Sequence, residues 1–508
     1  MSTPLLAVLP EVILTIVGVL IMLAEPMIPT GRSRKPLGWL AVFGTLAAGF
    51  AALYQHSQFS QFQWRTISAF YGTVQVDDFS VFFHLLLAAI IFVTLLATLD
   101  YFDGTPNSHA GEFYALTLFG ATGMMFMTCS VELLMVFIGL EISSISTYIL
   151  AGFRKGQATA SESSLKYFLL GSFATAFFLY GIALCFGATG STSIAAIHNG
   201  IATTTTPNLA ILAIAMVIVG LGFKVSLAPF HVWTPDVYQG APAPVVGMMS
   251  TAPKAAAFAV LLRFLFNGMP ALRPHWIVLI ELLAVASMCI GNLGALLQRD
   301  VKRLLAYSSI AHAGYLLVAF SSSRENAISA ALFYTAAYAA MNVGAFLVLT
   351  AVSGYGEESR TLDDYTGLAL RRPVLAALLS FFLISLIGIP FTGGFFGKFY
   401  SFTAAMYTGH VWLAVIGLIN SGIACFYYLR LLAALYTRPV VAADPAAETR
   451  KVAVPAGIAL ACAALATLIL GIAPGHLLHL TQRSTPITLP IASTPAPEAA
   501  PAPTALGQ

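Results

Sequence analysis

Three of the eight lysines in this sequence lie inside long apolar stretches, where charged residues are otherwise rare. They are Lys224, Lys254 and Lys398. Burial favours the neutral form of a lysine, whereas an arginine keeps its charge in nearly any setting. Placing a lysine near the centre of a bilayer costs roughly 2.5–3.5 kcal/mol. Three such residues therefore indicate groups that gain and lose a proton, and we expect them to form a proton path.

A glutamate in another apolar stretch is the natural counter-charge for these lysines. Glu141 lies midway along the apolar segment 131–153. We expect it to pair with Lys224, because a nearby carboxylate favours the charged form of a lysine. Moving or screening that carboxylate would let the lysine release its proton.

Five further titratable residues are weaker candidates for the same path. His231 and His312 lie inside apolar segments and can titrate near neutral pH, although a hydrogen-bonded structural histidine is an equal alternative for each. Lys302 is either a path residue or a charge that sets the orientation in the membrane. Glu162 and Lys166 are spaced i, i+4 on one helix face, which fits proton uptake from the inner side or a simple surface pair.

The remaining chemistry-bearing residues predict no metal or cofactor site in this chain. The cysteines all fall in apolar stretches, and their spacing fits neither a zinc site nor an iron–sulfur cluster, so we expect small buried hydrophobes. No dinucleotide-binding or phosphate-binding glycine motif is present. Glu11 is expected at the membrane interface, and Asp236 is expected to cap a helix. The cysteines are Cys129, Cys185, Cys289, Cys425 and Cys462.

The composition requires a membrane protein. Of the 508 residues, 58% are hydrophobic and only 9% are charged, whereas about 25% is usual for a soluble domain. So few charges cannot cover a surface in water, so most of the surface must face lipid. The net charge of +3 is small, and no basic run with interleaved aromatics occurs, which excludes a nucleic-acid partner.

Apolar stretches of about 20 residues recur along the chain, and each can cross a bilayer as a helix. Fourteen of them predict an all-α, polytopic fold. One set of alternate loops holds fourteen lysines and arginines, and the other set holds four. This asymmetry places the first set of loops inside and both termini outside. The spans are 5–24, 37–55, 78–99, 113–129, 131–153, 165–187, 208–239, 243–267, 275–297, 302–320, 326–352, 374–407, 410–436 and 452–475.

Two of the spans are too long and are interrupted by proline and glycine, around Pro229 and Pro390. Proline removes a backbone donor, so we expect two helices broken near mid-membrane. The breaks lie five spans apart, which predicts two inverted five-helix repeats. The predicted divisions are 1–110 (three N-terminal helices), 111–267 (first repeat), 268–437 (second repeat), 438–483 (a C-terminal helix) and 484–508 (a disordered Pro/Ala-rich tail).

The first broken segment carries a long motif, Gly220-Leu-Gly-Phe-Lys-Val-Ser-Leu-Ala-Pro-Phe-His-Val-Trp-Thr-Pro-Asp-Val-Tyr-Gln-Gly-Ala-Pro. It resembles the antiporter-like subunits of proton-pumping NADH:quinone oxidoreductase, the bacterial counterpart of respiratory complex I, and is most similar to the subunit N branch of that family. Lys302-Arg-Leu-Leu-Ala-Tyr-Ser-Ser-Ile-Ala-His-Ala-Gly-Tyr and Gly388-Ile-Pro-Phe-Thr-Gly-Gly-Phe-Phe-Gly-Lys-Phe-Tyr match as well. The resemblance covers nearly the whole chain except about the last 25 residues.

The resemblance implies fourteen helices with two inverted five-helix repeats and a polar axis running along the membrane. On that axis it pairs Glu141 with Lys224, makes Lys254 the central relay and puts Lys398 near the exit side. It implies proton translocation in a bacterial inner membrane, beside the other membrane-arm subunits and sister antiporter-like subunits. NADH, FMN, iron–sulfur clusters and quinone are expected in partner subunits. A multi-component cation/proton antiporter subunit and a structural subunit without an ion path are the alternatives.

Overall fold

A bundle of long helices accounts for most of this chain. The computed structural model describes residues 3–29, 31–61, 66–102, 109–357, 360–438 and 451–485. Within them, twelve helices are long and apolar enough to cross a membrane, or up to thirteen if one bent pair counts as a span. The α5 helix, Ala110–Cys129, also fills a predicted span, although its glycines and threonines make it less apolar. The predicted all-α polytopic fold is confirmed.

The elements follow one another in the order predicted from the apolar stretches, with short helices added between them. The helices are α1 Thr3–Ala7, α2 Leu9–Ala24, α3 Lys35–Gln61, α4 Asp78–Thr98, α5 Ala110–Cys129, α6 Leu133–Ala151, α7 Ala158–Thr189, α8 Ile194–Thr203, α9 Pro207–Val225, α10 Thr234–Gly240, α11 Ala243–Met249, α12 Ala252–Arg263, α13 Arg273–Leu296, α14 Val301–Val318, α15 Arg324–Ser353, α16 Leu368–Arg371, α17 Pro373–Ile387, α18 Gly393–Tyr407, α19 Val411–Tyr436, α20 Val454–Ile472 and α21 Pro474–Arg483.

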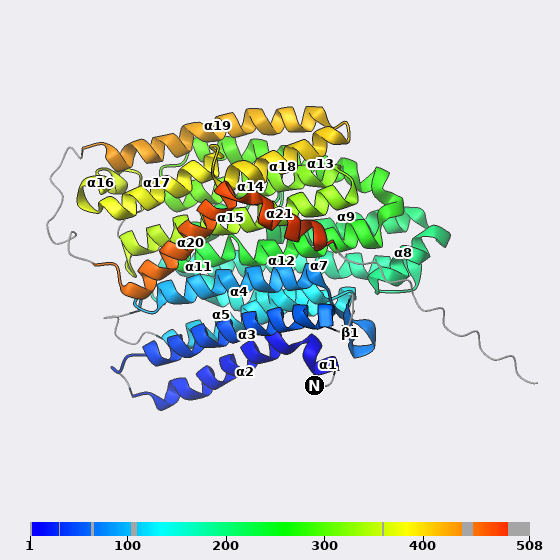
Figure 1. Ribbon diagram of the computed structural model, residues 1–508, viewed down its shortest axis with the longest axis horizontal. Coiled ribbons are helices and arrows are strands. Elements are labelled where there is room, and N and C mark those ends of the chain that lie inside the picture. The colour runs from blue at the N-terminus through cyan, green and yellow to red at the C-terminus, as the bar shows by residue number, and fades with distance from the viewer. Residues whose placement is uncertain are drawn as a thin grey trace, which may run out of the picture.

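A small hairpin that the sequence did not predict lies at the end of the bundle near the N-terminus (Figure 1). Its strands, β1 Ile67–Ala69 and β2 Val74–Val76, are antiparallel, and Ile67 pairs with Val76. Ser130, at the end of α5, forms a bridge to Val74. The hairpin therefore covers the ends of α4 and α5.

Both predicted helix breaks are present. The α9 helix ends at Val225, where Ser226 takes a left-handed conformation with φ 62°, and the chain becomes helical again only in α10. The α17 helix ends in the same way at Gly388, with φ 89°, before α18. A residue in the left-handed conformation turns the chain out of the helix. The carbonyls of the last helical turn then lose the N–H partners that they would have found four residues ahead.

A third interruption was not predicted. The segment 243–267 was expected to be one continuous helix, but α11 stops at Met249 and α12 begins at Ala252. Pro253 stands in the first turn of α12, where its missing N–H costs nothing. This break lies one turn before Lys254, so all three apolar-span lysines lie close to interrupted helices.

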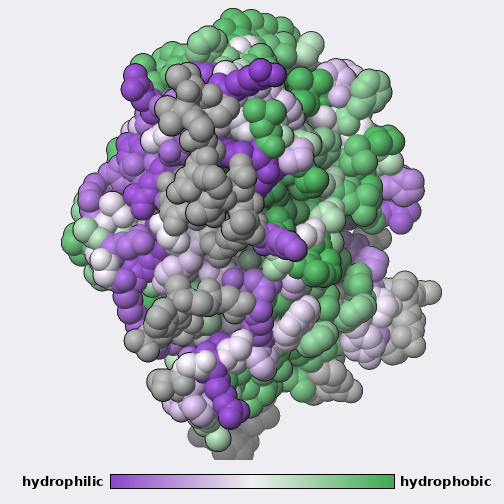
Figure 2. Space-filling view, turned by 90° about the vertical axis from the view of Figure 1, so that its left-hand side faces the viewer, coloured by the Kyte–Doolittle hydropathy of each residue, from purple (hydrophilic) through white to green (hydrophobic). Residues whose placement is uncertain are grey.

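The helices run side by side along the long axis of the molecule, with α2 and α3 on one flank and α19 on the other (Figure 1). The α20 helix crosses this array and contacts both α4 and α15. Hydrophilic residues gather at the end of the bundle seen in Figure 2, beside an apolar flank. That end carries α16 and is the one that the loop charges predict to be inside.

The division into two inverted repeats stays a prediction, as do the flanking segments. The predicted repeats 111–267 and 268–437 each contain one span broken by a left-handed residue. Of the predicted disordered tail, all but residues 484 and 485 lies outside the described residues.

Candidate functional site

Lys224 occupies an aromatic pocket at the end of α9. Its side chain is buried, and its ammonium nitrogen lies 5.0 Å from the ring centre of Tyr148 and 5.3 Å from that of Tyr167. Ring faces attract cations, so these tyrosines offset part of the cost of burying the charge. Within the described chain this nitrogen has no hydrogen-bond partner. Lys224 is therefore the least anchored of the three lysines.

The expected partner of Lys224 is close but not in contact. The carboxylate of Glu141, on α6, acts electrostatically on the Lys224 ammonium. One carboxylate oxygen of Glu141 is nevertheless buried without a hydrogen-bond partner among the described residues. The predicted pairing is thus a through-space interaction, which a small movement of either side chain would strengthen or weaken.

Tyr238 bridges the region between Lys224 and the next lysine, and sequence reasoning did not single it out. It is fully buried on α10, with its ring edge-on to Trp233 at 6.1 Å between centres. Its phenol interacts electrostatically with Tyr167 on the Lys224 side and with Tyr338 on the other side. The Ser309 side chain on α14 acts on its hydroxyl, although no hydrogen bond of regular geometry reaches that hydroxyl among the described residues.

Lys254 is held by a serine on the neighbouring helix α14. Its ammonium donates to the Ser309 hydroxyl oxygen at 2.5 Å and to the Ser309 carbonyl at 3.3 Å. The Tyr338 hydroxyl donates to the same serine oxygen at 2.7 Å. All three side chains are buried. Ser309 is therefore the polar contact that fixes Lys254 in the middle of the bundle.

His312 lies one helical turn beyond Ser309 and joins this group to the next. Its Nδ1 lies 2.8 Å from the Tyr334 hydroxyl, and its Nε2 lies 3.3 Å from the Tyr428 hydroxyl. The charges of Lys254 and Lys398 both act on it. The structure thus places the His312 ring where Lys254 and Lys398 both act on it, and its role in a proton path stays a prediction.

Lys398 is anchored by the broken end of α17. Its ammonium donates to the Leu386 carbonyl at 3.2 Å, to the Ile387 carbonyl at 2.7 Å and to the Ser421 hydroxyl at 2.8 Å. These carbonyls are free because α17 ends at Gly388, and the end of a helix carries partial negative charge. The break therefore supplies a binding place for a protonated lysine inside the apolar bundle.

Lys302 belongs to a buried ionic cluster rather than to the lysine series. Its ammonium lies 2.6 Å from a Glu357 carboxylate oxygen, and the Arg154 guanidinium lies 2.8 Å from the same oxygen. Lys302 and Arg154 are both buried. Whether Lys302 takes part in the path or sets the orientation of the chain stays a prediction. No pattern in the sequence pointed to Glu357, which lies 55 positions from Lys302 and much farther from Arg154.

His231 does not contact the lysines. It lies in the irregular segment between α9 and α10, half-buried, rather than inside a helix as expected. Its Nδ1 has no hydrogen-bond partner in the described part of the chain. Its position at the break keeps it a candidate, but no contact in the structure connects it to Lys224.

A second ionic network lies where α7, α10 and α14 meet. Lys166 lies 2.6 Å from Glu162 and 2.7 Å from Asp236, and Arg303 lies 2.6 Å from the other Asp236 oxygen. Burial opposes ionisation of Asp236, but the hydrogen bonds from Lys166 and Arg303 prevail and hold its pKa below the ordinary value. Asp236 does not cap α10, so that expectation is wrong.

Known proteins share this architecture. Residues 130–424 match the family described as NADH:quinone oxidoreductase/Mrp antiporter, TM. The chain is 51% identical over 480 residues to NADH-quinone oxidoreductase subunit N 2 of Koribacter versatilis, covering 94% of this chain and 96% of that protein. A chain of respiratory complex I from Thermus thermophilus is 35% identical, with a TM-score of 0.76 and 93% and 99% coverage.

The fold also occurs outside that group. A chain of the Mrp complex from Dietzia sp. DQ12-45-1b superposes with a TM-score of 0.83, covering 96% of this chain and 97% of that one. At 21% identity this likeness concerns the fold alone. The helix arrangement is thus shared by chains of respiratory complex I and of an Mrp complex.

Proposed function

Because this chain belongs to the subunit N family of NADH-quinone oxidoreductase, the antiporter-like subunits of the membrane arm, we propose that it carries protons across the membrane along its buried lysines. The observation that carries the proposal is the series of buried polar side chains that runs from Lys224 through Lys254 to Lys398 inside an apolar bundle. Intramembrane ionisable groups are costly and mark ion pathways. None of these three lysines forms an ion pair within 4.0 Å among the described residues, so a purely structural salt bridge does not account for them.

The first step would depend on the carboxylate of Glu141. While it is ionised and near, it favours a proton on Lys224, and the tyrosine rings hold the ammonium in place. When quinone reduction elsewhere in the complex shifts the local charge, that support weakens and Lys224 releases its proton. The loose anchoring of Lys224 makes it the group most easily switched.

The proton would then pass to the centre of the bundle. Tyr238 stands between Tyr167 and Tyr338, and its hydroxyl, which interacts with Ser309, would connect the Lys224 pocket with that serine. Lys254 accepts the proton there, and its charge favours departure of the proton already on Lys398. The tyrosine-bound ring of His312 links the two lysines.

The last lysine would store the proton before release. The two carbonyls at the end of α17 stabilise the charged form of Lys398. When Lys254 becomes positively charged, it repels the charge on Lys398 and raises the energy of protonated Lys398. The proton of Lys398 then leaves on the outer side. The Glu162, Lys166 and Asp236 network would supply protons from the inner side, near the broken helix α9/α10.

The redox chemistry would reside in partner subunits. NADH, FMN, iron–sulfur clusters and quinone belong to those chains in this proposal, which gives this one only the coupled movement of protons. The complex would lie in a bacterial inner membrane with both termini of this chain outside. Relatives named as NADH-quinone oxidoreductase subunits favour this function over a separate cation/proton antiporter.

Purification through a tag on this chain tests the assembly, and substitution of Lys224 tests the site. We expect the chain to copurify with flavin and iron–sulfur absorbance. In membrane vesicles, Lys224→Ala is expected to slow both NADH-driven quinone reduction and proton pumping. Lys155→Ala serves as the control, because the side chain of Lys155 is 66% exposed, and it is expected to leave both rates unchanged. Wild-type pumping by an assembled Lys224→Ala complex would exclude Lys224 from the path.

A further inference from the structure

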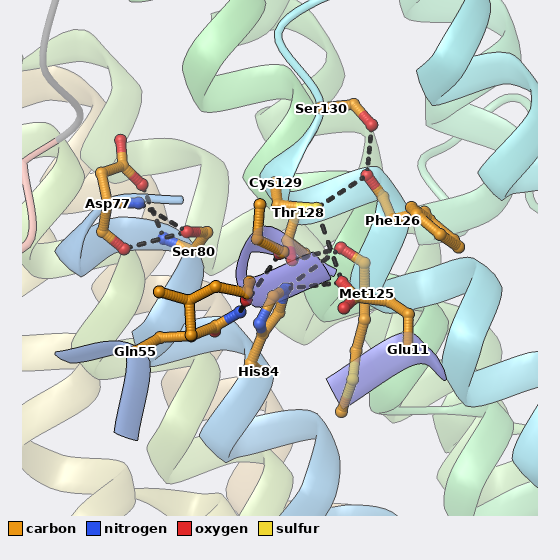
Figure 3. Close-up of polar contacts among 12 residues, drawn as sticks. Glu11, Gln55, Asp77, Ser80, His84, Met125, Phe126, Thr128, Cys129 and Ser130 are labelled. Atoms are coloured by element: carbon orange, nitrogen blue, oxygen red, sulfur yellow. Dashed lines mark hydrogen bonds and ion pairs between the residues drawn. The ribbon is translucent and has the colours of Figure 1, made fainter. Parts of the chain in front are cut away.

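Three side chains of different chemistry meet outside the proton path, under the β1/β2 hairpin. They are Glu11 on α2, His84 on α4 and Cys129 at the end of α5, and all three are fully buried (Figure 3). Their nearest carboxylate, imidazole and thiol atoms all lie within 4.8 Å of one another. The Glu11 carboxylate was expected at the interface, and its burial contradicts that expectation.

The polar atoms of this cluster are incompletely satisfied by the protein. Glu11 Oε1 lies 3.4 Å from His84 Nε2 and 3.5 Å from the Cys129 sulfur. The second carboxylate oxygen of Glu11 and Nδ1 of His84 are buried without a hydrogen-bond partner among the described residues. A buried ionised carboxylate with one oxygen that accepts no hydrogen bond is costly, so its charge needs a neutralising group or a proton.

Neighbouring charges do not supply that group. Arg263 is the nearest cation, and it is bound to both carboxylate oxygens of Asp77, at 2.5 and 3.0 Å. The amide of Gln55 donates to the carbonyls of Leu6 and Ala7, so it points to the backbone. The carboxylate and thiol must therefore either stay protonated or be neutralised by an ion.

We propose that Glu11, His84 and Cys129 bind a zinc ion. Zinc takes carboxylate, imidazole and thiolate ligands with bonds of about 2.0–2.3 Å, so donor atoms in a tetrahedral site lie ~3.3–3.7 Å apart. The two measured separations from Glu11 Oε1, 3.4 and 3.5 Å, fall in this range. Calcium and magnesium are disfavoured because neither binds thiolate well.

The charge of such a site suits its surroundings. One carboxylate and one thiolate balance the two positive charges of zinc, and a neutral imidazole adds none, so the bound site is neutral inside an apolar bundle. A water would fill the fourth position. His84 would bind through Nε2, which faces the Met125 carbonyl at 3.3 Å, and its proton would then be on Nδ1, which has no acceptor among the described residues.

The site would fasten the first long helix to the bundle. The α2 helix contacts α3 and α5, and much of its surface faces outward. A metal bound to α2, α4 and α5 together would fix the N-terminal helix against the two helices behind it. Spacing along the sequence did not reveal this site, because Glu11 and Cys129 are separated by 118 positions.

Zinc analysis of the whole complex tests the proposal. The complex, purified through a tag on this chain, is stripped with a chelator, incubated with zinc sulfate alone and washed. We expect wild type and Cys462→Ser, a change of an exposed cysteine, to retain one more zinc per complex than Cys129→Ser. Zinc-edge X-ray absorption of wild type should show one sulfur at about 2.3 Å and lighter ligands at about 2.0–2.1 Å.

Two results would overturn the site. One is equal zinc content in wild type and Cys129→Ser; the other is a zinc shell without sulfur. If Cys129→Ser does not assemble, Glu11→Gln, which keeps the shape of the side chain, replaces it and is expected to lose the same zinc. NADH:quinone activity of each variant reports assembly independently of zinc, because the cluster lies outside the lysine series.

Discussion

Replacing Ser309 by alanine removes the one side chain that holds Lys254. The lost contact is a hydrogen bond from a charged donor, worth about 1.5–3 kcal/mol. Since 1.36 kcal/mol corresponds to a tenfold change, the ratio of protonated to neutral Lys254 falls by a factor of about 13 to 160. If the proton must stop at this lysine, coupled turnover of Ser309→Ala slows by a similar factor.

The assay compares NADH-driven quinone reduction with acidification of the lumen in proteoliposomes. Ser146→Ala is a matched control, because Ser146 is also buried but bonds only to the Ile142 carbonyl of its own helix. Tyr338→Phe leaves the Ser309 oxygen available to Lys254 and is expected to have a smaller effect. Wild-type rates in Ser309→Ala, with normal assembly, would refute the position given to Lys254.

Three further outcomes are expected from the same geometry. Lys398→Arg keeps the charge beside the α17 carbonyls but cannot release a proton, so pumping should fall more than tenfold in an assembled complex; near-normal pumping would show that Lys398 never deprotonates. Glu357→Gln leaves Arg154 and Lys302 without their carboxylate and should destabilise the complex by about 3–5 kcal/mol, measured as a lower unfolding temperature; an unchanged temperature would contradict the buried cluster. Asp236→Asn should cost less than about 1 kcal/mol, because this network is partly exposed. The lowered pKa keeps Asp236 ionised, so the difference in stability between wild type and Asp236→Asn should stay constant from pH 8 to 5. This difference should vanish only as the pH falls through the lowered pKa of Asp236. Loss of the difference in stability above pH 5 would contradict the network.

The parts of the site that follow from local chemistry could be predicted from sequence. A lysine inside an apolar stretch is unusual wherever it points, so Lys224, Lys254 and Lys398 were identified by residue type alone. Both helix breaks were also predictable, because proline and glycine act on their own backbone.

Contacts between distant segments were not predictable. Glu357 joins two cations far away in sequence, and Tyr238 acquires its place only when α10 packs between α7 and α14. The burial of Glu11 depends on the packing of α2 against α5, which local sequence does not show. Cys462 was expected to be buried but is exposed on α20, because a helix facing lipid is apolar on its outer side too.

The proton-to-electron ratio of the Lys254→Ala complex tests the central claim most directly. Lys254 is buried at the middle of the series, and its ammonium bonds only to Ser309 among the described residues. Proteoliposomes containing this variant, with Lys155→Ala as control, would be given NADH and quinone while proton uptake into the lumen is recorded. The account predicts fewer protons per electron, or a loss of coupled turnover, in Lys254→Ala alone. A wild-type ratio at a wild-type rate in the assembled variant would contradict it.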